Sequence, residues 1–112
     1  MKAPQRRLGE AGEDQHWGSI EEFKHRVRAW AVRIGARPNR IRVQGMTKKW
    51  GSCSPNGVLT FSSQLLSKPR RVGEAVIVHE LVHLKVPNHG PLFRSLADTY
   101  LPGASDPGPM TE

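Results

Sequence analysis

The sequence predicts an α+β domain: an N-terminal helix, a small three-stranded antiparallel sheet, a metal-binding helix and a closing C-terminal helix. Three observations lead to this prediction. Apolar residues follow a helical period over residues 20–34, and short segments with turn residues between them occupy residues 40–62. A longer segment at residues 69–86, whose apolar residues would cover most of a helix, contains the pattern His-Glu-x-x-His. With 112 residues, the chain is expected to form one domain.

The domain is expected to span residues 18–101. Residues 1–17 are rich in Gly, Arg, Gln and Glu without an apolar period, which predicts a mobile tail. Residues 102–112 are rich in Pro, Gly, Ala and Ser, which predicts a disordered tail. The single cysteine, Cys53, excludes an internal disulfide framework and suits a reducing compartment. No signal peptide or membrane-length apolar run is found, so we expect a cytoplasmic protein without membrane contact.

The first helix is predicted to begin at Ser19, because Ser19 and Glu22 have the spacing of a capping box. Gly35 is a natural C-terminal stop. Trp17 is placed to pack over the first turn. One apolar stripe follows in steps of three and four, and it consists of Ile20, Phe23, Val27, Trp30 and Ile34. This stripe indicates packing against a core.

Three short strands are predicted between the helices. Residues 40–44 alternate polar and apolar side chains, as a half-buried strand does. Residues 50–53 form a second candidate strand. Residues 54–57 read Ser-Pro-Asn-Gly, which is typical of a turn, and residues 58–62 are the return strand of a hairpin. We expect these strands to pair in an antiparallel sheet.

The metal-binding helix is predicted to run from about Pro69 to Val86 and to be buried, because apolar residues cover most of its circumference. His79 and His83 are four residues apart, so both imidazoles project from one face and can bind one Zn²⁺ together. Glu80 is offset from His79 by about 100° and can accept a proton from an activated water. The alternative is a core helix with two hydrogen-bonded histidines.

A third ligand is expected from His89, because Pro87 ends the helix and the chain can then turn back. Three protein ligands leave a position for water, which is the catalytic arrangement. His89 could instead begin the next helix. Asp98 is a rival ligand that we place beside an imidazole N–H or on the surface. Cys53 could be a fourth ligand or a redox-sensitive thiol, although a packing role is favoured.

The last helix is expected to begin near Asn88 or Pro91 and to close the domain. Its apolar face consists of Leu92, Phe93, Leu96, Ala97 and Tyr100. Tyr100 could donate a hydrogen bond near the site, although packing is the favoured role.

The formal net charge is +7, and basic residues without any intervening acid gather between Lys24 and Lys49. Such a surface attracts nucleic acid or another polyanion, or it is simply a solvated basic face. No zinc finger, ribonucleoprotein motif or phosphate-binding loop supports specific nucleic-acid recognition. No oligomeric state follows from the sequence.

Several of these motifs occur in the order of one family. Trp50-Gly51-Ser52-Cys53-Ser54, His79-Glu80-Leu81-Val82-His83, Asn88-His89 and Phe93 resemble the YgjP-like metallopeptidases, which are related to the SprT/WSS zincin-type peptidases. The resemblance covers roughly residues 40–101. It implies a zincin-like core, with His79, His83 and His89 as zinc ligands and Glu80 as general base. Family members have a longer region before Trp50, so the chain resembles a minimal or truncated version.

The resemblance also implies a way to hold the substrate. In zincins an edge strand near the metal helix binds an extended peptide, and part of residues 57–62 is the candidate here. The alternative is an ordinary core hairpin, because the sequence does not say which strand is the edge. We therefore predict a zinc metallopeptidase that acts on peptides or proteins, in which Glu80 moves the water proton to the leaving amine. One alternative is a metal-dependent hydrolase of nucleotides or other phosphoanhydrides. The other is a non-catalytic, zinc-stabilised module that binds nucleic acid.

Overall fold

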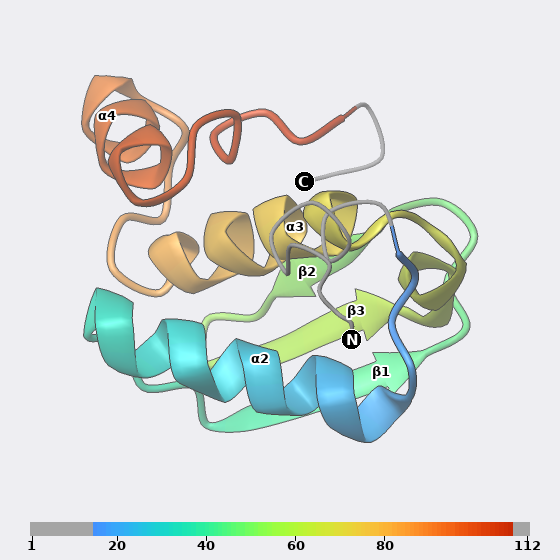
Figure 1. Ribbon diagram of the computed structural model, residues 1–112. Coiled ribbons are helices and arrows are strands. Elements are labelled where there is room, and N and C mark those ends of the chain that lie inside the picture. Colours follow the sequence, from blue (N-terminus) through green and yellow to red (C-terminus); the bar gives the residue numbers. More distant parts are fainter. Residues whose placement is uncertain (1–14, 109–112) are drawn as a thin grey trace.

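A computed structural model describes residues 15–108, and its elements follow the predicted order of a helix, a small sheet and two further helices (Figure 1). The elements are α2 (Ile20–Ile34), β1 (Arg40–Gln44), β2 (Gly51–Cys53), β3 (Val58–Ser62), the 3₁₀ helix η2 (Ser63–Ser67), α3 (Arg70–His83) and α4 (Pro91–Tyr100). Residues 1–14 of the predicted N-terminal tail and residues 109–112 of the predicted C-terminal tail lie outside the described residues.

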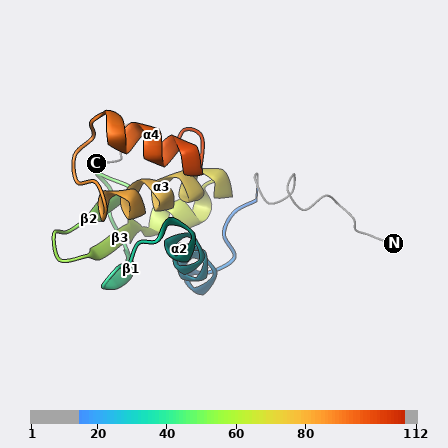
Figure 2. The same ribbon diagram turned by 90° about the vertical axis from the view of Figure 1, so that its left-hand side faces the viewer.

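The helix α3 occupies the centre of the molecule. It contacts α2, β2, η2 and α4, and Figure 2 shows α2 and α3 on one side of the sheet with α4 beyond α3. Every residue from Val76 to Val82 is buried, as the apolar sequence of this helix predicts. Among residues 15–108, no helix has the length and hydropathy needed to cross a membrane.

The sheet is mixed, so the prediction of an antiparallel sheet is only partly right. The β2–β3 hairpin is antiparallel, as its turn sequence indicates, and Gly51 pairs with Phe61. The strand order is β1-β3-β2, however, and β1 pairs with β3 in parallel. Residues 45–50 cross from one side of β3 to the other, which places the apolar β3 in the middle. The candidate edge strand within residues 57–62 is therefore not at an edge, and the alternative of a core hairpin is the one observed.

Local signals fix both ends of α2 as predicted. The Ser19 hydroxyl accepts a hydrogen bond from Glu22 N at 3.1 Å, while the Glu22 carboxylate accepts one from Gly18 N at 2.6 Å. At the other end, Gly35 adopts φ 79°, and its N–H bonds to the carbonyls of the last turn. The α2 helix is thus defined largely by its own sequence.

The packed part of the chain extends beyond residues 18–101 at both ends. Trp17 is buried and meets the Phe23 ring edge-on at a centroid distance of 5.0 Å. Gln15 accepts a hydrogen bond from Arg70 N. After α4 the chain returns towards α3, and Ala104 is fully buried there. Both segments lack a helical or strand period, so sequence periodicity assigns them to the tails.

Candidate metal centre

His79 and His83 lie on one face of α3, as their spacing predicts. The centroids of their rings are 4.8 Å apart. His79 is 2% exposed, whereas His83 is half-buried at the end of the helix. The sequence alone brings these two imidazoles together, because four residues correspond to about one helical turn.

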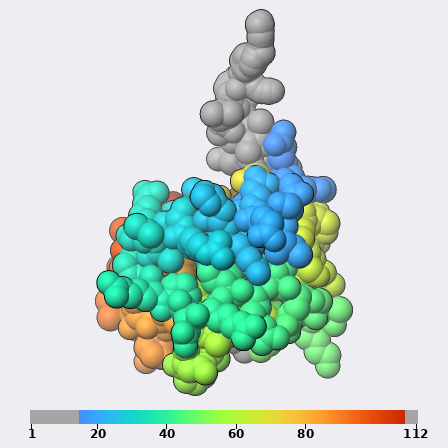
Figure 3. All heavy atoms as spheres, turned by 90° about the horizontal axis from the view of Figure 1, so that it is seen from below, coloured from blue at the N-terminus to red at the C-terminus, as the bar shows by residue number. Residues whose placement is uncertain are grey.

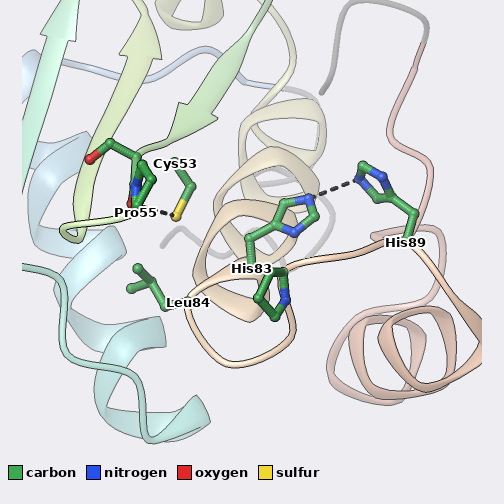
Figure 4. A pocket seen from close by; sticks show the side chains of 7 residues that line it. Cys53, Pro55, His83, Leu84 and His89 are labelled. Carbon is green, nitrogen blue, oxygen red and sulfur yellow. Dashed lines mark hydrogen bonds between the residues drawn. The ribbon is translucent and has the colours of Figure 1, made fainter.

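The loop after α3 brings His89 to the same place. Its Nε2 lies 2.8 Å from His83 Nε2 and 3.3 Å from His79 Nε2. Figure 4 shows His83 and His89 pointing towards each other from α3 and from the loop before α4. Arg94 donates to the His89 carbonyl at 3.2 Å, which ties this loop to the first turn of α4.

The second nitrogen of two of these rings faces a backbone carbonyl. His79 Nδ1 lies 2.9 Å from Ala104 O, and His83 Nδ1 lies 3.3 Å from Val86 O. A carbonyl can only accept, so the proton must be on Nδ1 of each ring. The Nε2 lone pairs of His79 and His83 are therefore directed towards His89.

This arrangement fits a tetrahedral metal ion. The ligand atoms of His79, His83 and His89 all lie within 4.8 Å of one another. Two nitrogens bound to Zn²⁺ at about 2.0–2.1 Å in tetrahedral geometry lie about 3.3 Å apart, close to the 3.3 Å between His79 and His89. Metal-bound histidines usually donate their other N–H to an oxygen, as His79 and His83 do here.

Phe93 supports all three rings. It is fully buried, stacks on His83 at 4.4 Å and meets His79 and His89 edge-on at 4.9 and 5.0 Å. A rigid aromatic side chain in this place limits how far each imidazole can rotate. The family pattern includes Phe93, but only the tertiary structure reveals this role.

Glu80 is fully buried beside the histidines and lies against β2. A Cβ atom at Gly51 would lie 3.0 Å from Glu80 Cγ and 3.1 Å from Glu80 Oε2. Real Cβ atoms are rarely this close to another atom, so the glycine makes room for the carboxylate. The close approach of β2 and α3 therefore depends on Gly51.

An open pocket of about 620 Å³ adjoins the histidines (Figure 4). Its lining consists of Cys53, Ser54, Pro55, His83, Leu84, Pro87 and His89. The turn after β2 forms one wall, and the end of α3 with the following loop forms the other. Ligands that enter this pocket reach the face on which His83 and His89 meet.

The alternative site residues lie elsewhere. The Asp98 carboxylate accepts two hydrogen bonds from Ser105, so the expectation that it bonds an imidazole is wrong, although its surface position agrees with the other expectation. Cys53 is half-buried and lines the pocket outside the histidine cluster. Tyr100 packs against the core.

Comparison with known proteins agrees with this geometry. The model of a family described as YgjP-like, metallopeptidase domain, matches residues 16–107. The chain belongs to the YgjP-like metallopeptidase family. Membership implies a metal ion and peptidase chemistry, and the three histidines fit metal binding. No curated protein sequence matches the chain.

Two solved structures share the fold of this YgjP-like protein. The metallopeptidase zymogen of Methanocaldococcus jannaschii jannalysin is 23% identical with a TM-score of 0.63, covering 70% of this chain and 81% of that one. The metallopeptidase zymogen of Pyrococcus abyssi abylysin is 19% identical with a TM-score of 0.65, covering 76% and 87%. At these identities the likeness establishes the fold, which agrees with the predicted zincin-like architecture.

Proposed function

We propose that the protein is a zinc-dependent metallopeptidase with His79, His83 and His89 as ligands and Glu80 as general base. The convergence of the three Nε2 atoms beside a pocket carries this proposal. Three imidazoles are a ligand set typical of catalytic zinc. When bound, zinc would lower the pKa of a water molecule and polarise the scissile carbonyl.

Glu80 supplies the proton transfer in this proposal. Its side chain is fully buried and faces Gly51 of β2, so the carboxylate is enclosed beside the histidines. A carboxylate held beside the attacking water removes its proton and then gives the proton to the leaving amine. Such positioning of the base is worth orders of magnitude in rate.

The edge strand β2 is the proposed binding site for an extended substrate, in place of residues 57–62. It pairs with β3 on one side only, Gly51 lies against Glu80, and Cys53 lines the pocket. A peptide that adds to β2 through main-chain hydrogen bonds would pass both groups. The apolar lining residues Pro55, Leu84 and Pro87 would then contact one side chain of the bound peptide.

The substitution Glu80→Gln tests the proposal, with zinc content and cleavage of casein or a peptide library as measurements. We expect about one zinc per chain in both proteins and loss of turnover in the variant. The matched control is Glu21→Gln, an exposed glutamate on α2 that should retain full activity. Cleavage by Glu80→Gln at the wild-type rate would refute the assignment of the base. Release of pyrophosphate from a nucleoside triphosphate without peptide cleavage would instead favour a phosphoanhydride hydrolase.

A second proposed function is the binding of a nucleic acid on a face formed by α2 and β1. No acidic residue occurs at residues 23–73. Six exposed basic side chains form what we call the basic surface, namely Arg28, Arg33, Arg37, Arg40, Arg42 and Lys48. Figure 3 shows α2 and β1 side by side on this face. A regular phosphate backbone matches such a concentration of positive charge.

The salt dependence of binding tests this second function. Binding of a fluorescent 20-nucleotide DNA or RNA should weaken steeply with salt, and Arg40→Gln with Arg42→Gln should lower the slope by about two. The control is Lys85→Gln, an exposed lysine that bonds to the end of α2 outside the basic surface. Unchanged slopes in the double variant would exclude this surface. Glu80→Gln should bind nucleic acid normally, which separates the two functions.

A further inference from the structure

The turn that follows α4 supplies a hydrogen-bond acceptor to the candidate metal centre. We propose that Asp98 is a positioning residue that fixes this turn and thereby orients His79 for metal binding. The inference rests on the proposed metal site but concerns residues that lie outside the ligand set. Neither the family motif nor the histidine spacing points to them.

The contact between the turn and the histidine is buried. His79 Nδ1 lies 2.9 Å from Ala104 O, His79 is 2% exposed, and Ala104 is fully buried. The contact is buried, so no water molecule can take the place of this carbonyl. The position of the turn therefore determines whether Nδ1 or Nε2 of His79 carries the proton. With the proton on Nδ1, the Nε2 lone pair of His79 is available to a metal.

The Asp98 carboxylate holds this turn from the outside. Oδ1 accepts a hydrogen bond from Ser105 N at 2.9 Å, and Oδ2 accepts one from Ser105 Oγ at 2.8 Å. Ser105 N belongs to the same peptide group as Ala104 O, so the first bond fixes the plane of this carbonyl, and the second holds the Ser105 side chain. These bonds also hold the pKa of Asp98 below its ordinary value. Within the turn, Ala104 N bonds to Leu101 O at 2.9 Å, and Gly103 adopts φ 92°.

The local sequence context opposes an aspartate at this position. Asp98 lies in the last turn of α4, where the helix dipole disfavours negative charge. Its side chain is exposed and makes no contribution to the core. Asp98 lowers the stability of the helix, yet it makes two hydrogen bonds to Ser105. Its role in fixing the turn explains why an aspartate occupies this position.

The experiment compares zinc affinity in Asp98→Ala, Asp98→Asn and the control Asp106→Ala, by competition with a chromophoric chelator. Loss of such indirect support typically costs 10–100-fold in metal affinity, and we expect about tenfold for Asp98→Ala. Asp98→Asn should stay close to wild type, because its amide can accept from Ser105 N and donate to Ser105 Oγ. Asp106 is exposed in the same segment, and Asp106→Ala should not change the affinity. Wild-type affinity in Asp98→Ala would overturn the inference.

A second measurement separates positioning from general stability. In ¹⁵N-labelled metal-free protein, NMR should find the His79 proton on Nδ1 in the wild type and in Asp98→Asn, and a mixture of tautomers in Asp98→Ala. Ser105→Ala removes only the hydroxyl bond and should give a smaller affinity loss, so it tests the inference even if Asp98→Ala fails to fold. An unchanged tautomer in both alanine variants would overturn it.

The outcome is distinguishable from failure of the proposed enzymatic function. Zinc affinity and tautomer state are measured without any substrate. If the protein binds zinc with the expected dependence on Asp98 but cleaves no peptide, the positioning role stands and the peptidase proposal fails. If zinc does not bind to the wild type at all, both fail.

Discussion

The two ends of α3 use their polar side chains in opposite ways. Near the start, Glu74 accepts hydrogen bonds from Arg26 Nε and Trp30 Nε1, and Arg70 pairs with Glu22. Each of these contacts joins α3 to α2. Near the end, His79 and His83 face a loop histidine, and Glu80 lies fully buried against β2. Polar groups at the first end tie helices together, whereas those at the second end converge on one point.

This difference indicates that the start of α3 contributes mainly to stability, whereas the end of α3 contributes mainly to the metal site. The first end also has aromatic contacts, since Arg70 lies 4.2 Å from the centre of the Trp17 ring, and Trp17 packs on Phe23. The second end gathers three imidazoles whose nitrogens are placed to bind one metal ion. We therefore expect substitutions at the start of α3 to lower stability and those at the end to abolish function.

The largest expected effect is on metal binding, when His83 is replaced by alanine. One ligand of three is lost, so zinc affinity should fall by more than about a hundredfold, beyond the loss caused by indirect supporting residues. Elemental analysis after dialysis measures this loss. In the presence of a chelator, the melting temperatures of wild type and variant should be similar, because the wild type is then also without zinc. Full zinc occupancy in the variant would contradict the assignment of the end of α3 to metal binding.

The next effect is on catalysis, through the close approach of β2 and Glu80. Gly51→Ala places a methyl group 3.0 Å from Glu80 Cγ and from Val76 Cγ1. Displacement of the base should lower kcat/KM by about 10–100-fold while zinc remains bound. Gly45→Ala is the matched control, because a Cβ atom there meets nothing within 4 Å. Equal peptidase activity in the two variants would contradict the role of Gly51.

A smaller effect, on stability alone, is expected at the start of α3. Glu74→Ala leaves Arg26 Nε and Trp30 Nε1 without their acceptor, which should cost about 1–3 kcal/mol of unfolding free energy. Urea denaturation with a chelator present measures it, and zinc affinity of the folded variant should not change. A double-mutant cycle with Arg26→Ala gives the energy of the pair. A loss of zinc affinity without a loss of stability would reverse the proposed division of α3.

The smallest effect is expected for the surface pair of Glu22 and Arg70. The hydrogen bond from Arg70 lowers the pKa of Glu22, with a further contribution from Gly18 N. The ionised carboxylate therefore stabilises the fold above the ordinary glutamate pKa, and this stabilisation is lost as the pH falls through the lowered pKa. Glu22→Gln should cost less than about 1 kcal/mol at neutral pH, because the pair is partly exposed. Glu21→Gln is the control, and an equal loss there would indicate a general helix-dipole effect.

Local signals in the sequence account for much of the fold. The Ser19 cap and Gly35 stop predict α2, the Ser-Pro-Asn-Gly turn predicts the hairpin, and the run of apolar residues predicts the burial of α3. Each signal acts over a few residues. Strand order has no such signal, because nothing in the local sequence of β1 favours pairing with β2 over pairing with β3. The sequence therefore predicts the antiparallel β2–β3 hairpin, but neither the parallel β1–β3 pairing nor which strand lies at the edge.

By itself, the sequence determined that His79 and His83 lie on one face of a helix, because the helical period fixes that relation. The meeting with His89, the support by Phe93, the space left by Gly51 and the carbonyl of Ala104 were decided only by the tertiary structure. These contacts join residues on different elements, and their geometry follows from how the sheet, α3 and α4 pack together.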